Sequence, residues 1–349
     1  MGASYLLSRF HSTYGNRFWF LIEEADLPPG VTKIQVAGSF NHWKPSEFWT
    51  LRRENVGRWI LDLPPGRVEA PGNSGYPEYQ FLLNDSVIMG ANFFPDEPRI
   101  GNNFLIIPSQ DSKVWLDRIR DLTRPKPLEG NEQNWLCNCW EVGGGQLASQ
   151  RLFRSSHPFL TALPDERESS RIKTVHELWN AYRVTDIINL ADGEAVIFDK
   201  TCPKPYAMAA RDGHVLFLPL EYQLVYYHTR GNLFQSAVGK ILTFIAQTRG
   251  PWMVHCRLGI DRTGVIVALL QALAGATWQQ IIKDYSRTAV FNPTEYRHPD
   301  LLAYCFKRLI SQHPETSPDL VQAMKNSLAR SVAHQEILNQ AITNLTQPV

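Results

Sequence analysis

The stretch VHCRLGIDRTG, residues 254–264, decides how this sequence is interpreted. It includes the end of a short apolar run at 252–254 that is typical of a buried strand. The segment that follows, 264–276, is apolar almost all round, as expected for a helix at the centre of a domain. A helix that starts here directs its unpaired N–H groups and partial positive charge at the preceding loop, where an anion such as phosphate fits.

Three residues in this stretch suit phosphate chemistry. The positive end of the helix favours the thiolate form of Cys256, which is the nucleophilic form. Arg262 lies six residues later and can bind two phosphate oxygens with its planar guanidinium. Gly259 permits the tight turn that lets successive N–H groups converge on an anion. The stretch therefore predicts a nucleophilic cysteine in a phosphate-binding loop.

The chain around this loop alternates between strand-like and helical segments, which predicts an α/β domain. Short apolar runs indicate the strands, and longer amphipathic runs indicate the helices. A polar tail with apolar residues at helical spacing, 318–346, predicts one or two further helices that pack on the surface. The expected strands are 185–190, 215–218 and 252–254, and the expected helices are 172–183, 232–248, 264–276 and 299–311.

The first part of the chain has a different pattern. Strand-like runs separated by turns rich in Pro and Gly predict a small Ig-like antiparallel β-sandwich, and a charged, Pro-containing segment follows them. We therefore expect a multidomain protein with a sandwich at 1–111, a linker at 112–133, the α/β domain at 134–312 and a C-terminal helical extension at 313–349. The expected strands of the sandwich are 18–24, 33–40, 58–63, 79–83 and 103–107.

Composition limits the classes of function. With 35 Lys+Arg against 34 Asp+Glu, the charge of +1 gives no electrostatic case for a nucleic-acid partner. The N-terminal residues lack the apolar core of a signal peptide, and no apolar stretch is long enough for a membrane span. We therefore expect a soluble protein that is cytoplasmic, or exported without a cleavable signal peptide.

The cysteines do not indicate a disulfide framework or a metal site. Five cysteines is an odd number in a long chain, so no disulfide framework is expected. Cys137 and Cys139 have no partner pair at the spacing of a zinc site, and we expect Cys202 and Cys305 to be packed thiols. We expect no metal and no cofactor.

The complete loop resembles that of the Cys-dependent tyrosine and dual-specificity phosphatases. His255 precedes the cysteine, and the loop ends in DRTG at 261–264, as in the bacterial and fungal branch of that family. Upstream, WEVGGG at 140–145 and LFRSS at 152–156 are similar to the opening segment of that branch. The resemblance covers about 135–310 and implies a tyrosine-phosphatase-like α/β fold that hydrolyses phosphomonoesters without a metal.

The resemblance also implies a role for each loop residue. Cys256 would attack phosphorus and form a phosphocysteine intermediate, while Arg262 and the loop amides hold the phosphate oxygens. Thr263 would donate a hydrogen bond to the sulfur, and His255 would order the loop through its ring. The implied phosphate-binding residues are Cys256, Arg257, Leu258, Gly259, Ile260, Asp261 and Arg262.

The general acid has two candidates. Asp261 matches the loop carboxylate to which this role is attributed in the DRTG branch, although a carboxylate here can also simply stabilise the helix end. Glu221 is the rival, because many relatives carry a mobile acidic loop after the corresponding strand, but Tyr222 occupies the position that they fill with Asp. We interpret Asp192 and Asp212 as turn residues.

Departures from the family pattern leave the substrate open. Relatives that act on phosphoinositides often carry lysine in the loop, whereas here Ile260 stands at one such position and Arg257 keeps a cation at another. Loops of glucan phosphatases usually end in Ala-Pro, unlike Thr263 and Gly264. A phosphorylated protein is the favoured substrate, with a phosphoinositide or phosphoglucan as alternatives. A non-catalytic phosphate-binding scaffold is disfavoured because the cysteine and arginine are intact.

Four segments of the first domain resemble, in order, the glycogen-binding modules of AMP-activated kinase β subunits and branching enzymes. They are VAGSFNHW at 36–43, WILDLPPG at 59–66, EYQF at 78–81 and NN at 102–103. Aromatic faces stack on sugar rings in those modules, which makes Trp43 a candidate for carbohydrate binding. Gln80 replaces a lysine of the pattern, the second aromatic position falls on Val87, and an insertion at 68–77 interrupts the strand pair. Docking on another domain or protein is the alternative role.

Overall fold

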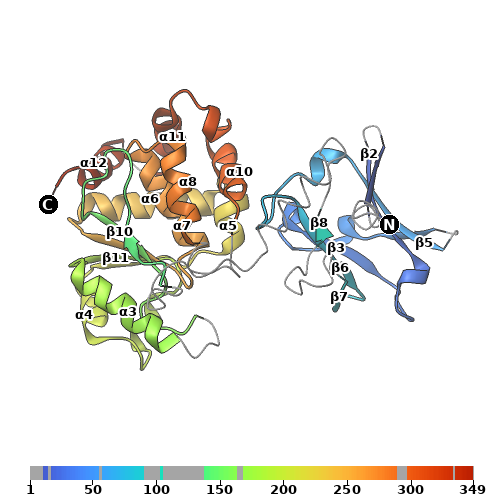
Figure 1. Ribbon diagram of the computed structural model, residues 1–349, viewed down its shortest axis with the longest axis horizontal. Helices are drawn as coiled ribbons and strands as arrows, with labels where there is room; N and C mark the ends of the chain where they lie inside the picture. Colours follow the sequence, from blue (N-terminus) through green and yellow to red (C-terminus); the bar gives the residue numbers. More distant parts are fainter. Residues whose placement is uncertain are drawn as a thin grey trace. The chain divides into compact units, whose positions relative to one another are not determined.

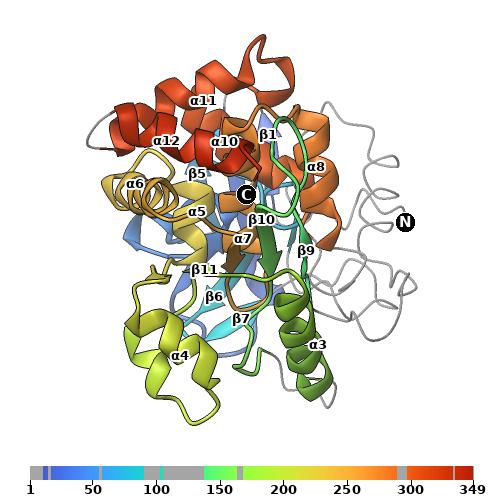
Figure 2. The same cartoon turned by 90° about the vertical axis from the view of Figure 1, so that its left-hand side faces the viewer.

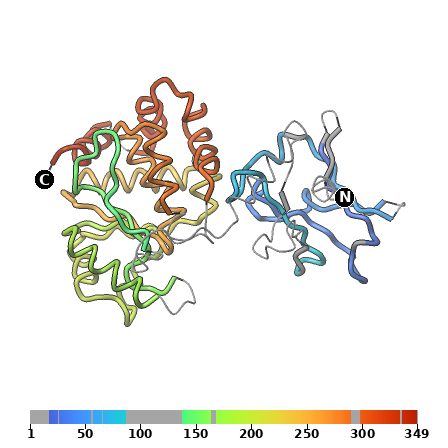
Figure 3. Tube along the Cα trace, in the orientation of Figure 1, coloured from blue at the N-terminus to red at the C-terminus, as the bar shows by residue number. Residues whose placement is uncertain are grey.

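The computed structural model divides into two compact units, Met1–Pro125 and Lys126–Val349 (Figures 1 and 3). The structure describes residues 11–14, 17–54, 57–89, 103–104, 137–162, 168–288, 297–332 and 335–348. The linker expected at 112–133 lies outside the described residues, and the expected domain boundaries stay predictions.

The N-terminal unit contains two small antiparallel sheets. Every run expected to be a strand contains one, although the run at 103–107 is described only at its first two residues. One sheet has the order β1 (His11–Tyr14), β2 (Arg17–Glu23), β5 (Arg58–Leu63), β4 (Arg52–Glu54). The other has the order β3 (Ile34–Gly38), β6 (Glu78–Leu83), β7 (Val87–Met89), and β8 (Asn103–Phe104) also pairs with β6.

An aromatic core joins these two sheets. Phe20 of β2 is fully buried, and its ring centroid lies 4.8 Å from that of Tyr79 and 6.2 Å from that of Phe81, both on β6. Tyr79, Phe81 and Leu83 alternate along β6 and are all buried, as expected for a strand with one face in a core. The Ig-like character of this unit stays a prediction.

The C-terminal unit is built on a five-stranded sheet. β13 (Trp252–His255) pairs in parallel with β10 (Leu152–Ser155) on one side and with β11 (Asp186–Asn189) on the other. β12 (Val215–Phe217) extends the parallel sheet beyond β11, and β9 (Trp140–Glu141) pairs antiparallel with β10. The sheet contains the three strands expected from sequence, together with two short ones that the sequence analysis did not predict.

Helices cover both faces of this sheet. In Figures 1 and 2, α3 (Glu168–Ala181) and α4 (Lys204–Arg211) lie on one side, and α6 (Asn232–Gln247) and α7 (Asp261–Leu273) lie on the other. The layered α/β architecture is confirmed. The four expected helices correspond to α3, α6, α7 and α10 (Pro299–Ile310), whereas α4 was not predicted. The remaining described helices are α5 (Tyr222–Tyr227), α8 (Trp278–Ser286), α11 (Leu320–Leu328) and α12 (Gln335–Thr346).

The helix after β13 is the central one. Residues 263–273 of α7 are all buried, because α7 packs on β13 and is itself covered by α8 and α11. The tail forms α11 and α12 as expected, with Met324, Leu328 and Leu338 fully buried. Within the described segments, no helix has both the length and the hydrophobicity needed to span a bilayer.

Gly239 tests how tightly the C-terminal segment packs on α6. A Cβ atom at Gly239 would lie 1.8 Å from the carbonyl oxygen of Ser331, which is far inside any normal contact. We expect Gly239→Ala to lower the free energy of unfolding by about 1–3 kcal/mol, because the two segments must move apart. Gly143→Ala is the control in urea denaturation, since nothing lies within 4 Å of its Cβ position. Equal losses in both variants would contradict this packing.

Candidate active site

The carboxyl ends of three parallel strands meet at one edge of the sheet. His255 ends β13 and is in register with Ser155 of β10 and with Asn189 of β11. Cys256 is the next residue after β13 and is only 2 % exposed. The loop from Cys256 to Ile260 then leads into α7, which begins at Asp261. Ligands of open α/β sheets bind at this edge, outside the carboxyl ends of the strands.

Three successive carbonyl groups of this loop are held from outside it. The backbone N–H of His157 donates to the Arg257 carbonyl at 3.0 Å, and Asn138 Nδ2 donates to the Leu258 carbonyl at 2.7 Å. Arg154 Nη2 donates to the Gly259 carbonyl at 2.7 Å. The C=O and N–H of one planar trans peptide point in opposite directions. The N–H groups of residues 258–260 therefore point away from these donors and can converge on an anion.

Gly259 is required at its position in the loop. Its φ is +73°, in the left-handed region that favours glycine. A Cβ here would also lie 2.6 Å from the carbonyl oxygen of Ser155. The loop can approach the end of β10 this closely only because residue 259 has no side chain.

Arg154 joins the loop to α8. Its side chain is fully buried, and Nη1 donates to Asp284 Oδ2 at 2.8 Å while Nη2 holds the loop. Trp140 Nε1 donates to the other oxygen of Asp284 at 2.7 Å, and the guanidinium carbon of Arg154 lies 4.7 Å from the Trp140 ring centroid. A buried charge needs such a partner and such hydrogen bonds, so the ion pair fixes the direction in which Arg154 points.

Two arginines line the cavity beside the loop. Arg262 Nη1 donates to the carbonyls of Leu190 and Leu220, each at 3.1 Å, so the ends of two neighbouring segments orient it. Arg257 Nε donates to the Ala162 carbonyl at 2.8 Å. The cavity has a volume of about 260 Å³. Its lining residues are His157, Leu160, Thr161, Ala191, Asp192, Arg257 and Arg262.

A sequence model described as the tyrosine phosphatase family matches residues 142–334, more than half of the 349 residues. The chain belongs to the tyrosine phosphatase family. A search of curated proteins found no match to the chain. Family membership makes this phosphatase a phosphoric monoester hydrolase.

His255 of this phosphatase is fully buried. Burial lowers its pKa well below the ordinary value, and the charge of the neighbouring His157 acts in the same direction. Its Nε2 lies 3.3 Å from the hydroxyl of Tyr206, which accepts a hydrogen bond from Asn189 Nδ2 at 3.0 Å. These contacts fix one side of the imidazole, and the expected role of His255 in ordering the loop stays a prediction.

Thr263 does not make the hydrogen bond expected of it. Its hydroxyl oxygen is buried and has no hydrogen-bond partner among the described residues. The hydrogen bond to the sulfur of Cys256 is therefore not formed in this structure. A buried hydroxyl without a hydrogen-bond partner costs free energy of folding. The Thr263 hydroxyl therefore has a donor to offer to the Cys256 sulfur if the two atoms come within hydrogen-bond distance.

The two acid candidates lie in different surroundings. Both carboxylate oxygens of Asp261 accept hydrogen bonds from Arg297, Oδ1 at 2.7 Å and Oδ2 at 3.2 Å, and Tyr226 donates to Oδ1 at 3.2 Å. Glu221 is exposed just before α5, and its side chain does not cap that helix. Neither residue lines the cavity described above, so the choice between them stays a prediction.

Sequence reasoning missed a histidine–aspartate pair in the cavity wall. His157 Nε2 lies 2.8 Å from Asp192 Oδ2, and Asn189 donates to the same oxygen at 3.2 Å. Burial alone would raise the pKa of Asp192, but these hydrogen bonds and the charge of His157 lower it below its ordinary value. Asp192 lies in a loop, as expected, but its carboxylate also faces the cavity. The sequence could have indicated this pair, because both residues follow the carboxyl ends of parallel strands.

The other residues singled out in the sequence lie outside this site. Asp212 caps the C-terminus of α4, which confirms it as a turn residue. Trp43 is half-buried in the N-terminal unit, and its role in carbohydrate binding stays a prediction. All five cysteines are free, and burial raises the pKa of Cys137 to about 11. No group of potential metal ligands occurs among the described residues.

Gly259→Ala tests the geometry of the loop. An alanine at φ +73° is strained, and its Cβ would push the loop away from Ser155. We expect kcat/KM for an aryl phosphate to fall by at least about tenfold, because the loop amides lose their convergence. Gly193→Ala is the control, since that glycine follows Asp192 but nothing lies within 4 Å of its Cβ position. Unchanged kcat/KM in Gly259→Ala would contradict the account.

Proposed function

We propose that this phosphatase hydrolyses phosphomonoesters through a phosphocysteine intermediate on Cys256. The thiolate attacks phosphorus, the S–P bond forms, and the bond from phosphorus to the ester oxygen breaks as that oxygen takes up a proton. Water then attacks phosphorus, the S–P bond breaks, and inorganic phosphate leaves. The proposal rests on one observation above all, the anchoring of three loop carbonyls that turns the N–H groups of residues 258–260 toward an anion.

Both cavity arginines support this chemistry. Negative charge spreads over the equatorial oxygens of the phosphoryl group during transfer, and a planar guanidinium binds two such oxygens. Arg262 is already oriented by two carbonyls, so little reorganisation is needed when substrate binds. Arg257 supplies a second positive charge at the same cavity.

We propose phosphotyrosine in a protein chain as the preferred substrate. The cavity of about 260 Å³ combines two cationic side chains with the apolar side chains of Leu160 and Ala191. Cations suit the phosphate, and apolar contacts suit the aromatic ring that carries it. The loop also lacks the lysine that phosphoinositide-directed relatives often carry, since Ile260 stands there.

The nucleophile is tested with Cys256→Ser and an aryl phosphate. We expect turnover to fall by at least about 10⁴-fold, because a serine hydroxyl is not ionised at neutral pH. Rapid quenching of the wild-type protein and mass spectrometry should show one added phosphoryl group on the peptide that contains Cys256. Cys202→Ser, which alters a half-buried thiol away from the cavity, should keep its turnover. Equal turnover in Cys256→Ser and wild type would overturn the mechanism.

We propose Asp261 as the general acid, and leaving-group dependence tests it. Arg297 holds both carboxylate oxygens of Asp261, so the side chain must leave this pair before its carboxyl can reach the ester oxygen of a substrate. We expect Asp261→Asn to lower kcat about 10²- to 10⁴-fold for phenyl phosphate, which needs a proton donor, and much less for p-nitrophenyl phosphate. Glu221→Gln should lower neither value. The reverse pattern would assign the role to Glu221.

A further inference from the structure

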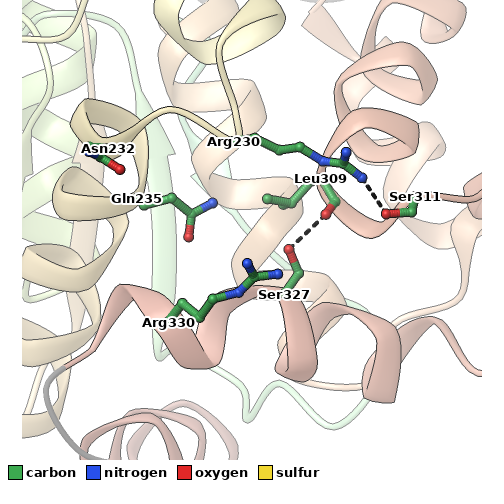
Figure 4. A pocket seen from close by; sticks show the side chains of 7 residues that line it. All are labelled: Arg230, Asn232, Gln235, Leu309, Ser311, Ser327 and Arg330. Carbon is green, nitrogen blue, oxygen red and sulfur yellow. Dashed lines mark hydrogen bonds between the residues drawn. The ribbon is translucent and has the colours of Figure 1, made fainter.

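A second cavity with two arginines lies in the C-terminal unit. Its volume is about 360 Å³, and it is lined by Arg230, Asn232, Gln235, Leu309, Ser311, Ser327 and Arg330 (Figure 4). These residues come from the turn before α6, the first turn of α6, the end of α10, α11 and the short helix η8 (Ala329–Ser331). The two cavities share no lining residue. The second cavity is therefore a separate site.

Its charge is positive and not compensated by the protein that surrounds it. No carboxylate lines the cavity, and neither Arg230 nor Arg330 pairs with a carboxylate among the described residues. Arg230 Nη2 donates to the hydroxyl of Ser311. α6 begins at Asn232, so the positive end of its dipole adds to the same field. Arg230 and Arg330 are both exposed at this cavity, so an anion that enters it is attracted by both guanidinium groups.

The walls are fixed by their own hydrogen bonds. Gln235 Nε2 donates to the Thr229 carbonyl at 2.7 Å, and the Ser331 hydroxyl donates to Gln235 Oε1. The Ser327 hydroxyl donates to the Leu309 carbonyl at 2.8 Å (Figure 4). These bonds tie together three segments that are distant in sequence. The side chains of Gln235 and Ser327 are thus satisfied within the wall, while the two guanidinium groups keep donors for a ligand.

We propose that this cavity binds the phosphate group of a small ligand. Arginine matches the geometry of phosphate oxygens, and two of them from separate segments can share one dianion. A volume of about 360 Å³ is in the range of small-molecule sites and exceeds what a phosphate ion needs. The cavity therefore has room for free phosphate or for a phosphomonoester with a small organic group.

The experiment measures stabilisation by inorganic phosphate in full-length Arg262→Ala, which weakens phosphate binding at the catalytic loop. We expect a saturable rise in Tm beyond that given by sodium chloride at equal ionic strength. Adding Arg230→Ala or Arg330→Ala should raise the half-saturating phosphate concentration about 10- to 100-fold, the effect of losing a charge-assisted hydrogen bond. Lys307→Ala, which removes an exposed charge on α10 outside the cavity, should leave it unchanged.

The proposal is overturned if phosphate gives no saturable stabilisation, or if the two arginine variants bind it as well as Lys307→Ala does. Should Arg262→Ala fail to fold, the wild-type protein is titrated with phosphate while the Nε–H resonances of Arg230 and Arg330 are followed by NMR. Shifts of both support the site, and their absence contradicts it. Repeating the titration with glycerol phosphate distinguishes the sources, since tighter binding than inorganic phosphate indicates an organic phosphomonoester.

Discussion

The anchoring of three consecutive carbonyls is the constraint on which the catalytic site depends. Asn138, Arg154 and the backbone of His157 hold the carbonyls of residues 257–259 from outside the loop. Without them, the loop could turn carbonyl oxygens inward, and a phosphate dianion would meet partial negative charge. With them, the N–H groups that follow point away from the anchors, where they are free to converge on an anion. Preorganisation of this kind is what makes electrostatic catalysis effective.

Each anchor depends in turn on the packing of the α/β unit. Arg154 and His157 come from β10 and the turn after it, and β10 is adjacent to β13 only because of the order of the sheet. Arg154 is itself directed by Asp284 of α8, and His157 is tied to Asp192 after β11. β10, β13, α8 and the loop after β11 are far apart in the sequence, but all of them help to position the loop that follows β13. A loss of packing in any of them is expected to reach the loop.

The sequence predicted those site residues that are close together in the chain, but not those that only the fold brings together. The nucleophile, the arginine and the strand–loop–helix unit all lie between Trp252 and Leu273, so spacing and hydrophobic pattern were sufficient. The roles of Asn138, Arg154 and Asp192 could not be predicted from spacing, because these roles depend on which strands become neighbours. The Arg297 partner of Asp261 is likewise 36 residues away. β10 is only four residues long, too short for alternation to be distinguished from a turn.

Binding of phosphate by the N–H groups of Leu258, Gly259 and Ile260 is tested by following their backbone resonances in NMR while full-length protein is titrated with inorganic phosphate. We expect all three amide protons to move downfield together and to saturate at one phosphate concentration, because N–H groups that donate to an anion are deshielded. If phosphate shifts other amides of the domain while these three stay unchanged, the loop does not form the phosphate site.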